Sequence, residues 1–200
     1  MFAFFAGVGA GLLHVFSGPD HLAAVAPLAA DTKTSWRAGL QWGVGHTFGV
    51  LLIALLLLVV KQQLPLELIS AYSERIVGVS LIAIGLWGIW GAWMRGGEAP
   101  EVRSHSHAGA SFAIGTIHGL AGSSHLFGVL PALAFSARAD SILYLGGFGI
   151  GAIAGMSAFA AGLGLLSVRF GRHQHRRFSG LLYASSAAAL VIGGFWLVGR

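Results

Sequence analysis

The chain has 200 residues, of which 56% are hydrophobic and only 10% are charged. A soluble globular domain carries about 25% charged residues, so this composition excludes an ordinary soluble domain and indicates an integral membrane protein. The net charge is +5, but the basic residues lie in short segments at the ends of apolar stretches, so we expect no nucleic-acid partner. The absence of cysteine from the sequence excludes disulfides, thiolate metal sites and thiol relays.

Apolar segments occupy most of the chain. A helix needs about 20 residues to cross a bilayer. Six segments are about this long: residues 3–29, 37–60, 71–94, 111–135, 141–166 and 179–198. We therefore predict an all-α membrane protein with six transmembrane helices, in contact with the lipid bilayer. Because the N-terminal segment lacks the basic start of a signal peptide, we expect it to be a retained first helix.

The basic residues predict the orientation of the chain, because Lys and Arg are enriched in short cytoplasmic loops. The odd-numbered loops hold eight: Lys33, Arg37, Arg95, Arg103, Arg169, Arg172, Arg176 and Arg177. The other side holds four: Lys61, Arg75, Arg138 and Arg200. This distribution predicts a multi-pass protein of the inner (cytoplasmic) membrane with both termini outside.

One sequence motif of 20 residues, called the duplicated phrase below, occurs twice in the chain. Residues 11–30 read GLLHVFSGPDHLAAVAPLAA, and residues 115–134 read GTIHGLAGSSHLFGVLPALA. Two histidines, a glycine and a proline keep register between the copies: His14 with His118, Gly18 with Gly122, His21 with His125, and Pro27 with Pro131. This shared register indicates an internal duplication.

The duplicated phrase opens the first and the fourth apolar segments, so each repeat contains three. An odd number of spans inverts the second repeat relative to the first, as in many secondary transporters. The sequence therefore predicts two inverted three-helix repeats, at residues 1–94 and 111–200. A polar, histidine-containing cytoplasmic linker, 95–110, joins them.

The first copy contains a helix breaker. Pro19 cannot donate a hydrogen bond to the preceding turn, and Gly18 tolerates distortion, so we expect the first span to break near Gly18-Pro19. The break would let Asp20 turn toward the histidines, and it predicts a cavity because irregular backbone inside a bilayer must be buried or face water. In the second copy Ser123 and Ser124 replace Pro-Asp, so we expect that half to lose both the charge and the break.

The chemistry of these segments points to a metal. A carboxylate at the bilayer centre costs roughly 2.5–3.5 kcal/mol, which a bound cation would offset. Two alternatives stay open: Asp20 could cap the restarted helix, and an isolated histidine is commonly a satisfied interface residue. Imidazoles with one carboxylate suit a borderline divalent transition metal. The candidate ligands are His14, Asp20, His21, His46, His118 and His125.

Two further histidine pairs lie in predicted cytoplasmic loops. His105 and His107 could stage a metal ion at the cytoplasmic mouth, although short solvated runs of this kind also occur by chance. His173 and His175 stand among arginines, whose charge opposes a cation, so contact with lipid headgroups explains them better.

The motifs HVFSGPDHLAAVAPLA and GHTFGVLL resemble those of the nickel/cobalt transporter superfamily. The resemblance is to its six-span branch of UreH-like urease accessory membrane proteins, to which HGLAGSSH is also similar. It implies that His14, Asp20 and His21 select the metal and that His46 belongs to a second histidine motif. The larger nickel permeases place four residues between the histidine and Asp-His, whereas this chain has five. Cysteine-dependent thiol-disulfide carriers share the three-plus-three plan, but this chain has no cysteine.

These observations favour a secondary transporter of Ni²⁺ or Co²⁺, with a site between the first, second and fourth spans. The metal would be the transported substrate, and no resident cofactor is expected. A membrane accessory protein that binds metal for urease or hydrogenase maturation is the main alternative, and a bis-histidine haem carrier would also use His14 and His118. The sequence contains neither His-Glu-x-x-His nor Gly-x-Ser-x-Gly, so we expect no enzyme. The sequence leaves open whether the protein forms a homo-oligomer and whether it binds urease or hydrogenase maturation partners.

Overall fold

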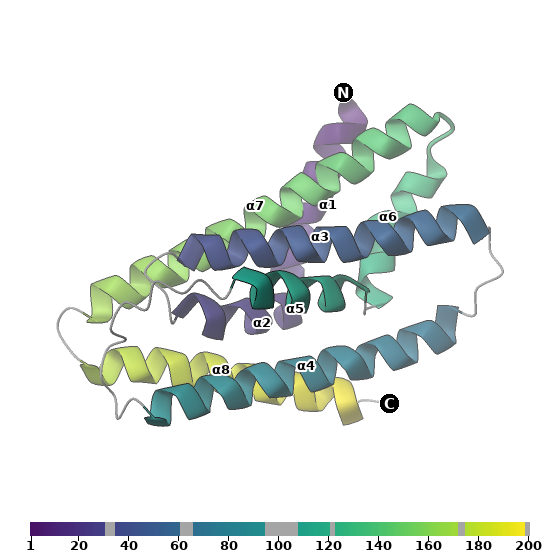
Figure 1. Ribbon diagram of the computed structural model, residues 1–200. Coiled ribbons are helices and arrows are strands. Elements are labelled where there is room, and N and C mark those ends of the chain that lie inside the picture. The colour runs from purple at the N-terminus through teal and green to yellow at the C-terminus, as the bar shows by residue number, and fades with distance from the viewer. Residues whose placement is uncertain (31–34, 61–65, 95–107, 121–122, 172–174, 199–200) are drawn as a thin grey trace.

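All six apolar segments of the sequence form helices in the computed structural model, which describes residues 1–30, 35–60, 66–94, 108–120, 123–171 and 175–198 (Figure 1). The helices are α1 (Phe2–Ser17), α2 (Pro19–Ala30), α3 (Ser35–Val60), α4 (Leu66–Met94), α5 (Ala108–Leu120), α6 (Ser123–Ala134), α7 (Arg138–Gly171) and α8 (His175–Val198). The last three residues of the predicted linker therefore already belong to α5.

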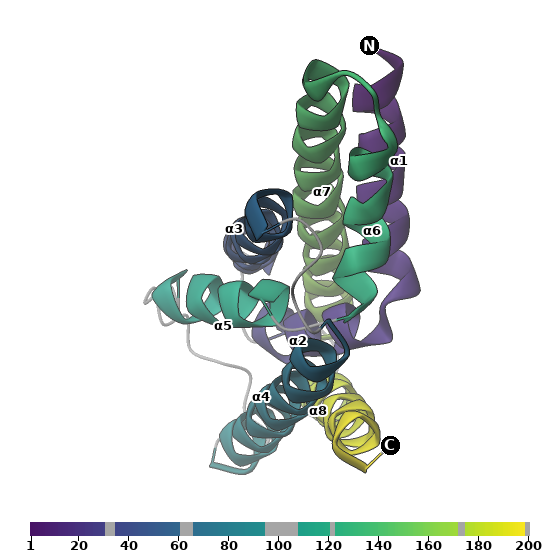
Figure 2. The same cartoon turned by 90° about the vertical axis from the view of Figure 1, so that its right-hand side faces the viewer.

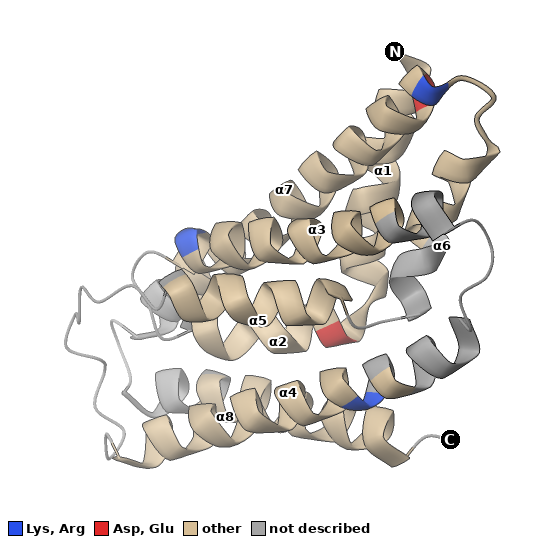
Figure 3. Cartoon of the chain, turned by 45° about the vertical axis from the view of Figure 1, so that its right-hand side comes forward, with Lys and Arg blue, Asp and Glu red and all other residues tan. Residues whose placement is uncertain are grey.

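Three described helices are individually long and apolar enough to cross a bilayer. They contain the spans Ser35–Leu55, Arg75–Met94 and Arg138–Leu166, and the bent pair α1 and α2 gives a fourth if it counts as one span. Figure 3 shows that charged residues are sparse along the described helices. The chain is an all-helical membrane protein, as its composition predicts, whereas six spans stay a prediction.

The first span breaks where the sequence predicts. The N–H of Gly18 donates to the carbonyl of His14 at 3.2 Å and closes α1, and the N–H of His21 donates to the carbonyl of Gly18 at 3.1 Å. The new helix starts at Pro19, whose missing N–H costs nothing at the first helical position. The two helices are bent by 75° at this break.

The second copy of the phrase is also divided into two helices, so the expectation that it lacks a break is wrong. α5 ends at Leu120 and α6 begins at Ser123, and Figure 2 shows α5 lying across the direction of α6. Serine favours helix starts over helix interiors, because its hydroxyl can bond to backbone groups there. A glycine followed by serines thus starts a new helix without the proline.

Closely spaced backbones join α1 to α7 and α5 to α3. A Cβ added at Gly7 or Gly11 would collide with the backbone of α7, and one added at Gly115 or Gly119 would collide with the backbone of α3. Small residues let membrane helices approach in this way. α4 packs along α8 on another side of the molecule (Figure 2).

The main hydrophobic core surrounds α2, whose small side chains let four helices close on it. Ala24, Val25 and Ala29 of α2 are fully buried, and the same cluster contains Trp42 of α3 and Met156 of α7, together with residues of α4 and α8. In the first turn of α2, Asp20 and His21 are buried as well, whereas Pro19 is exposed. That turn carries two of the predicted ligands.

Candidate metal centre

The break between α1 and α2 brings three predicted ligands together. His14 lies in the last turn of α1, and Asp20 and His21 lie in the first turn of α2. A helix N-terminus favours a carboxylate, because its free N–H groups carry partial positive charge. A Cβ at Gly18 would collide with the imidazole of His21 and lie 2.9 Å from Oδ1 of Asp20. Glycine is therefore needed for this close approach.

Two more of the predicted ligands, His46 and His118, come from α3 and α5. Gly119 of α5 lies directly against the backbone of His46, so the glycine contact between these helices holds His46 and His118 near each other. Their ring centroids are 6.0 Å apart. Both side chains are fully buried.

Asp20 is the centre of the polar contacts. Its Oδ1 lies 3.1 Å from Nδ1 of His21, and its Oδ2 lies 3.1 Å from Nε2 of His118. The side chain of Asp20 is only 6% exposed. Because a buried charge is tolerated only with partners, these imidazoles or a cation held with them must stabilise it. Asp20 thus does more than begin a helix.

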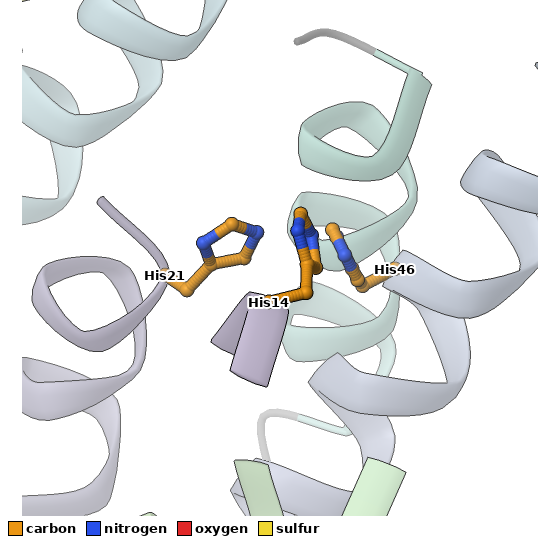
Figure 4. A group of neighbouring side chains, drawn as sticks. All are labelled: His14, His21 and His46. Carbon is orange, nitrogen blue, oxygen red and sulfur yellow. The ribbon is translucent and has the colours of Figure 1, made fainter. Parts of the chain in front are cut away.

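The nitrogen and oxygen atoms form two sets of possible metal ligands. One set is His14, His21 and His46, and the other is Asp20, His21 and His118; within each set the ligand atoms all lie within 4.8 Å of one another. Figure 4 shows the three imidazoles of the first set gathered from α1, α2 and α3. Two ligands about 2 Å from one metal can be at most about 4 Å apart, so small ring movements suffice to close each set.

The structure thus brings together five of the six predicted ligands, and their ligation of metal stays a prediction. The sixth, His125, lies in α6, and its side chain is outside the described part of the chain. His105 and His107, the predicted staging residues, also lie outside the described residues.

Trp42 is a site residue that the sequence reasoning missed. Its fully buried ring stacks on His46, with centroids 5.1 Å apart and planes inclined by 12°, and its centroid lies 5.2 Å from that of His118. Its indole N–H has no hydrogen-bond partner among the described residues. Trp42 is four residues before His46, so helical spacing alone places both on one face.

Three curated proteins are similar in sequence to this chain. The urease accessory protein UreH from Bacillus sp. (strain TB-90) is 31% identical over 171 residues, which cover 78% of this chain and 73% of that protein. Two chloroplast proteins of Arabidopsis thaliana, FOR GROWTH AND FERTILITY 2 and FOR GROWTH AND FERTILITY 1, are 36% and 34% identical over 94% of this chain. The alignments cover 54% and 56% of these plant proteins, so the chain spans about half their length.

No family model matches the chain, and no solved structure matches it. The similarity to UreH covers more than two thirds of both proteins, which agrees with the resemblance that the histidine motifs indicate. The chain belongs to the family of the urease accessory protein UreH.

Proposed function

We propose that this protein is a secondary transporter that carries Ni²⁺, or Co²⁺, across the cytoplasmic membrane. The observation that carries the proposal is the buried cluster of one carboxylate and four imidazoles at the broken helix, in a membrane protein. Imidazole with carboxylate suits divalent transition metals. Urease is a nickel enzyme, so similarity to a urease accessory protein also supports nickel as the substrate.

The proposed architecture is six spans in two inverted repeats, with both termini outside. The pairing of the helices supports this architecture. In the first half α1 packs on α7 of the second half, and in the second half α5 packs on α3 of the first half, in both cases through glycines. Both α3 and α7 are the long helices that follow a broken span. Transporters of this plan bind their substrates at the interface between the repeats. The five described ligands lie where helices of both halves meet.

We also propose that the chain is not an enzyme and that an electrochemical gradient drives transport. The sequence has no nucleotide-binding loop, so the energy would come from the membrane potential, a proton gradient or a separate partner. Metal binding displaces protons from its ligands, which would link the movement of metal to that of protons. Vesicle uptake that responds to neither an imposed pH gradient nor Asp20→Asn would contradict proton coupling.

The decisive experiment measures ⁶³Ni²⁺ uptake into proteoliposomes that contain the wild type or Asp20→Asn. We expect uptake to fall at least about tenfold in the variant, because even outer-shell partners of metal ligands contribute about 10–100-fold to affinity or activity. Asp140→Asn is the matched control, because Asp140 lies in the first turn of α7 and belongs to neither ligand set. Equal uptake by the wild type and Asp20→Asn would refute this site as the path.

The second candidate is an accessory protein that binds metal for urease or hydrogenase maturation without transporting it. The printed name of the UreH relative favours this candidate. The same proteoliposomes separate the two functions, since an accessory protein would bind ⁶³Ni²⁺ in detergent yet accumulate none inside sealed vesicles. His105→Ala with His107→Ala would then test the staging role of the linker, which predicts slower loading and unchanged affinity.

A further inference from the structure

The two ligand sets share one residue, His21. The neutral set joins it to His14 and His46, and the acidic set joins it to Asp20 and His118. The remaining ligands of the two sets come from different helices: α1 and α3 for the neutral set, α2 and α5 for the acidic set. The sets therefore describe two neighbouring positions for a cation, with one imidazole common to both.

The two nitrogens of the His21 ring face different sets. Nδ1 lies 3.1 Å from Oδ1 of Asp20, within the acidic set. In Figure 4 the His21 ring directs one nitrogen toward His14 and His46 and the other away from them. Because Nδ1 is the nitrogen beside Asp20, the one directed toward the neutral set is Nε2.

A neutral imidazole offers a lone pair on only one nitrogen at a time. His21 can therefore serve the acidic set through Nδ1 or the neutral set through Nε2, but not both while it stays neutral. Two divalent ions on opposite sides of one ring would also repel each other strongly in a buried site. Both arguments favour one ion that alternates between two positions.

We infer that the site holds a single divalent transition-metal ion in two alternative positions, and that His21 passes the ion from the acidic set to the neutral set. As the ion leaves Nδ1 and binds Nε2, the ring loses its proton at Nε2 and gains one at Nδ1, so the imidazole stays neutral. The passage of the ion between the two positions rests on the proposed function. The two binding positions themselves rest on the geometry of the ligands. The acidic position cancels one positive charge of the ion, whereas the neutral position cancels none. The ion therefore meets a different charge at each position along its path.

Binding of Co²⁺ to purified protein, followed by visible absorption and by metal analysis, tests the two positions. We expect one Co²⁺ per chain in the wild type. If the two positions have similar affinity, the loss of either one lowers the observed association constant by only about twofold, since the populations of the two bound states add. His46→Ala and His118→Ala should each retain one Co²⁺, with different absorption spectra that report an Asp-containing and an all-imidazole ligand set.

His21→Ala removes a ligand from both positions, so we expect it to weaken Co²⁺ binding about a hundredfold or more. Thr47→Val is the matched packing control beside His46, because it removes only a hydroxyl bonded to the carbonyl of Gly149. Size-exclusion profiles identify variants that fail to fold, and His46→Gln and His118→Asn then replace the alanines. Equal, large losses of affinity in the His21, His46 and His118 variants would overturn the inference, because they indicate one position with shared ligands.

Measurements of Co²⁺ transport into proteoliposomes distinguish a failure of this inference from a failure of the proposed function. Variants confined to one position should bind Co²⁺ and transport almost none. A wild type that binds Co²⁺ in two positions but transports none would contradict transport while leaving the two positions intact. A transporting wild type with a single spectrum, the same in every variant that binds metal, would contradict the two positions while leaving transport intact.

Discussion

Replacing Gly18 with alanine tests whether the helix break holds the ligands in place. The added Cβ would collide with Nδ1 of His21 and lie 2.6 Å from its Cε1 and 2.9 Å from Oδ1 of Asp20. Both ligands would have to move, and overpacking of this kind costs about 1–3 kcal/mol. If that cost falls on the metal-bound state, Ni²⁺ affinity drops about 5- to 140-fold, at 1.4 kcal/mol for each factor of ten.

Isothermal titration of Ni²⁺ into the purified variant measures this loss directly. Gly9→Ala is the matched control, because a Cβ at Gly9 in α1 would have no neighbour within 4 Å. We expect this control to bind Ni²⁺ like the wild type and to be slightly more stable, since alanine suits a helix interior better than glycine. If Gly18→Ala also binds like the wild type, the reasoning that ties the break to the site is refuted.

Three further predictions concern packing and a spectroscopic signal. Gly11→Leu should separate α1 from α7 and lower the melting temperature, because even a Cβ there collides with the α7 backbone, whereas Gly146→Ala, in open space inside α7, should leave it unchanged or raise it slightly. Tyr144→Phe should destabilise the protein by about 0.5–1.5 kcal/mol in chemical unfolding, through loss of a 2.9 Å bond to a carbonyl of α6, while metal affinity stays unchanged. Trp42→Phe should remove most of the fluorescence quenching by Ni²⁺, because this indole stacks against the site and is the one fully buried tryptophan among the described residues.

The sequence predicts the first break well because its cause is local. Pro19 lacks an N–H, and no packing elsewhere in the protein can restore that donor. Asp20 and His21 also lie close together for a local reason, because they are neighbours in the first turn of α2, with Oδ1 of Asp20 3.1 Å from Nδ1 of His21. The second break was missed because serine favours a helix start but, unlike proline, does not prevent the preceding helix from continuing, so the surrounding structure decides.

The arrangement of the second half of the site depends on contacts far apart in the sequence. That Gly119 lies against His46, so that His118 reaches Asp20, follows from the packing of α5 on α3. The sequence predicts that the first, second and fourth spans meet at the site, but it does not predict which residues of α5 and α3 face each other. Trp42 was missed because a tryptophan in an apolar span is ordinarily interpreted as a packing or lipid-facing residue. Its spacing from His46 places it on the same helix face, and the ring contact shows that it lies at the site.

The pairing of α1 with α7 has a consequence for biosynthesis. The backbone of α7 that receives the glycines of α1 begins near Tyr144, so the partner of the first helix is synthesised after about two thirds of this sequence. Until then α1 has its glycine face uncovered in the membrane, and His14 lacks its neighbour Phe148. The first span is thus among the last to reach its final packing. The ligand cluster can therefore form only after both halves of the chain have been synthesised and have packed together.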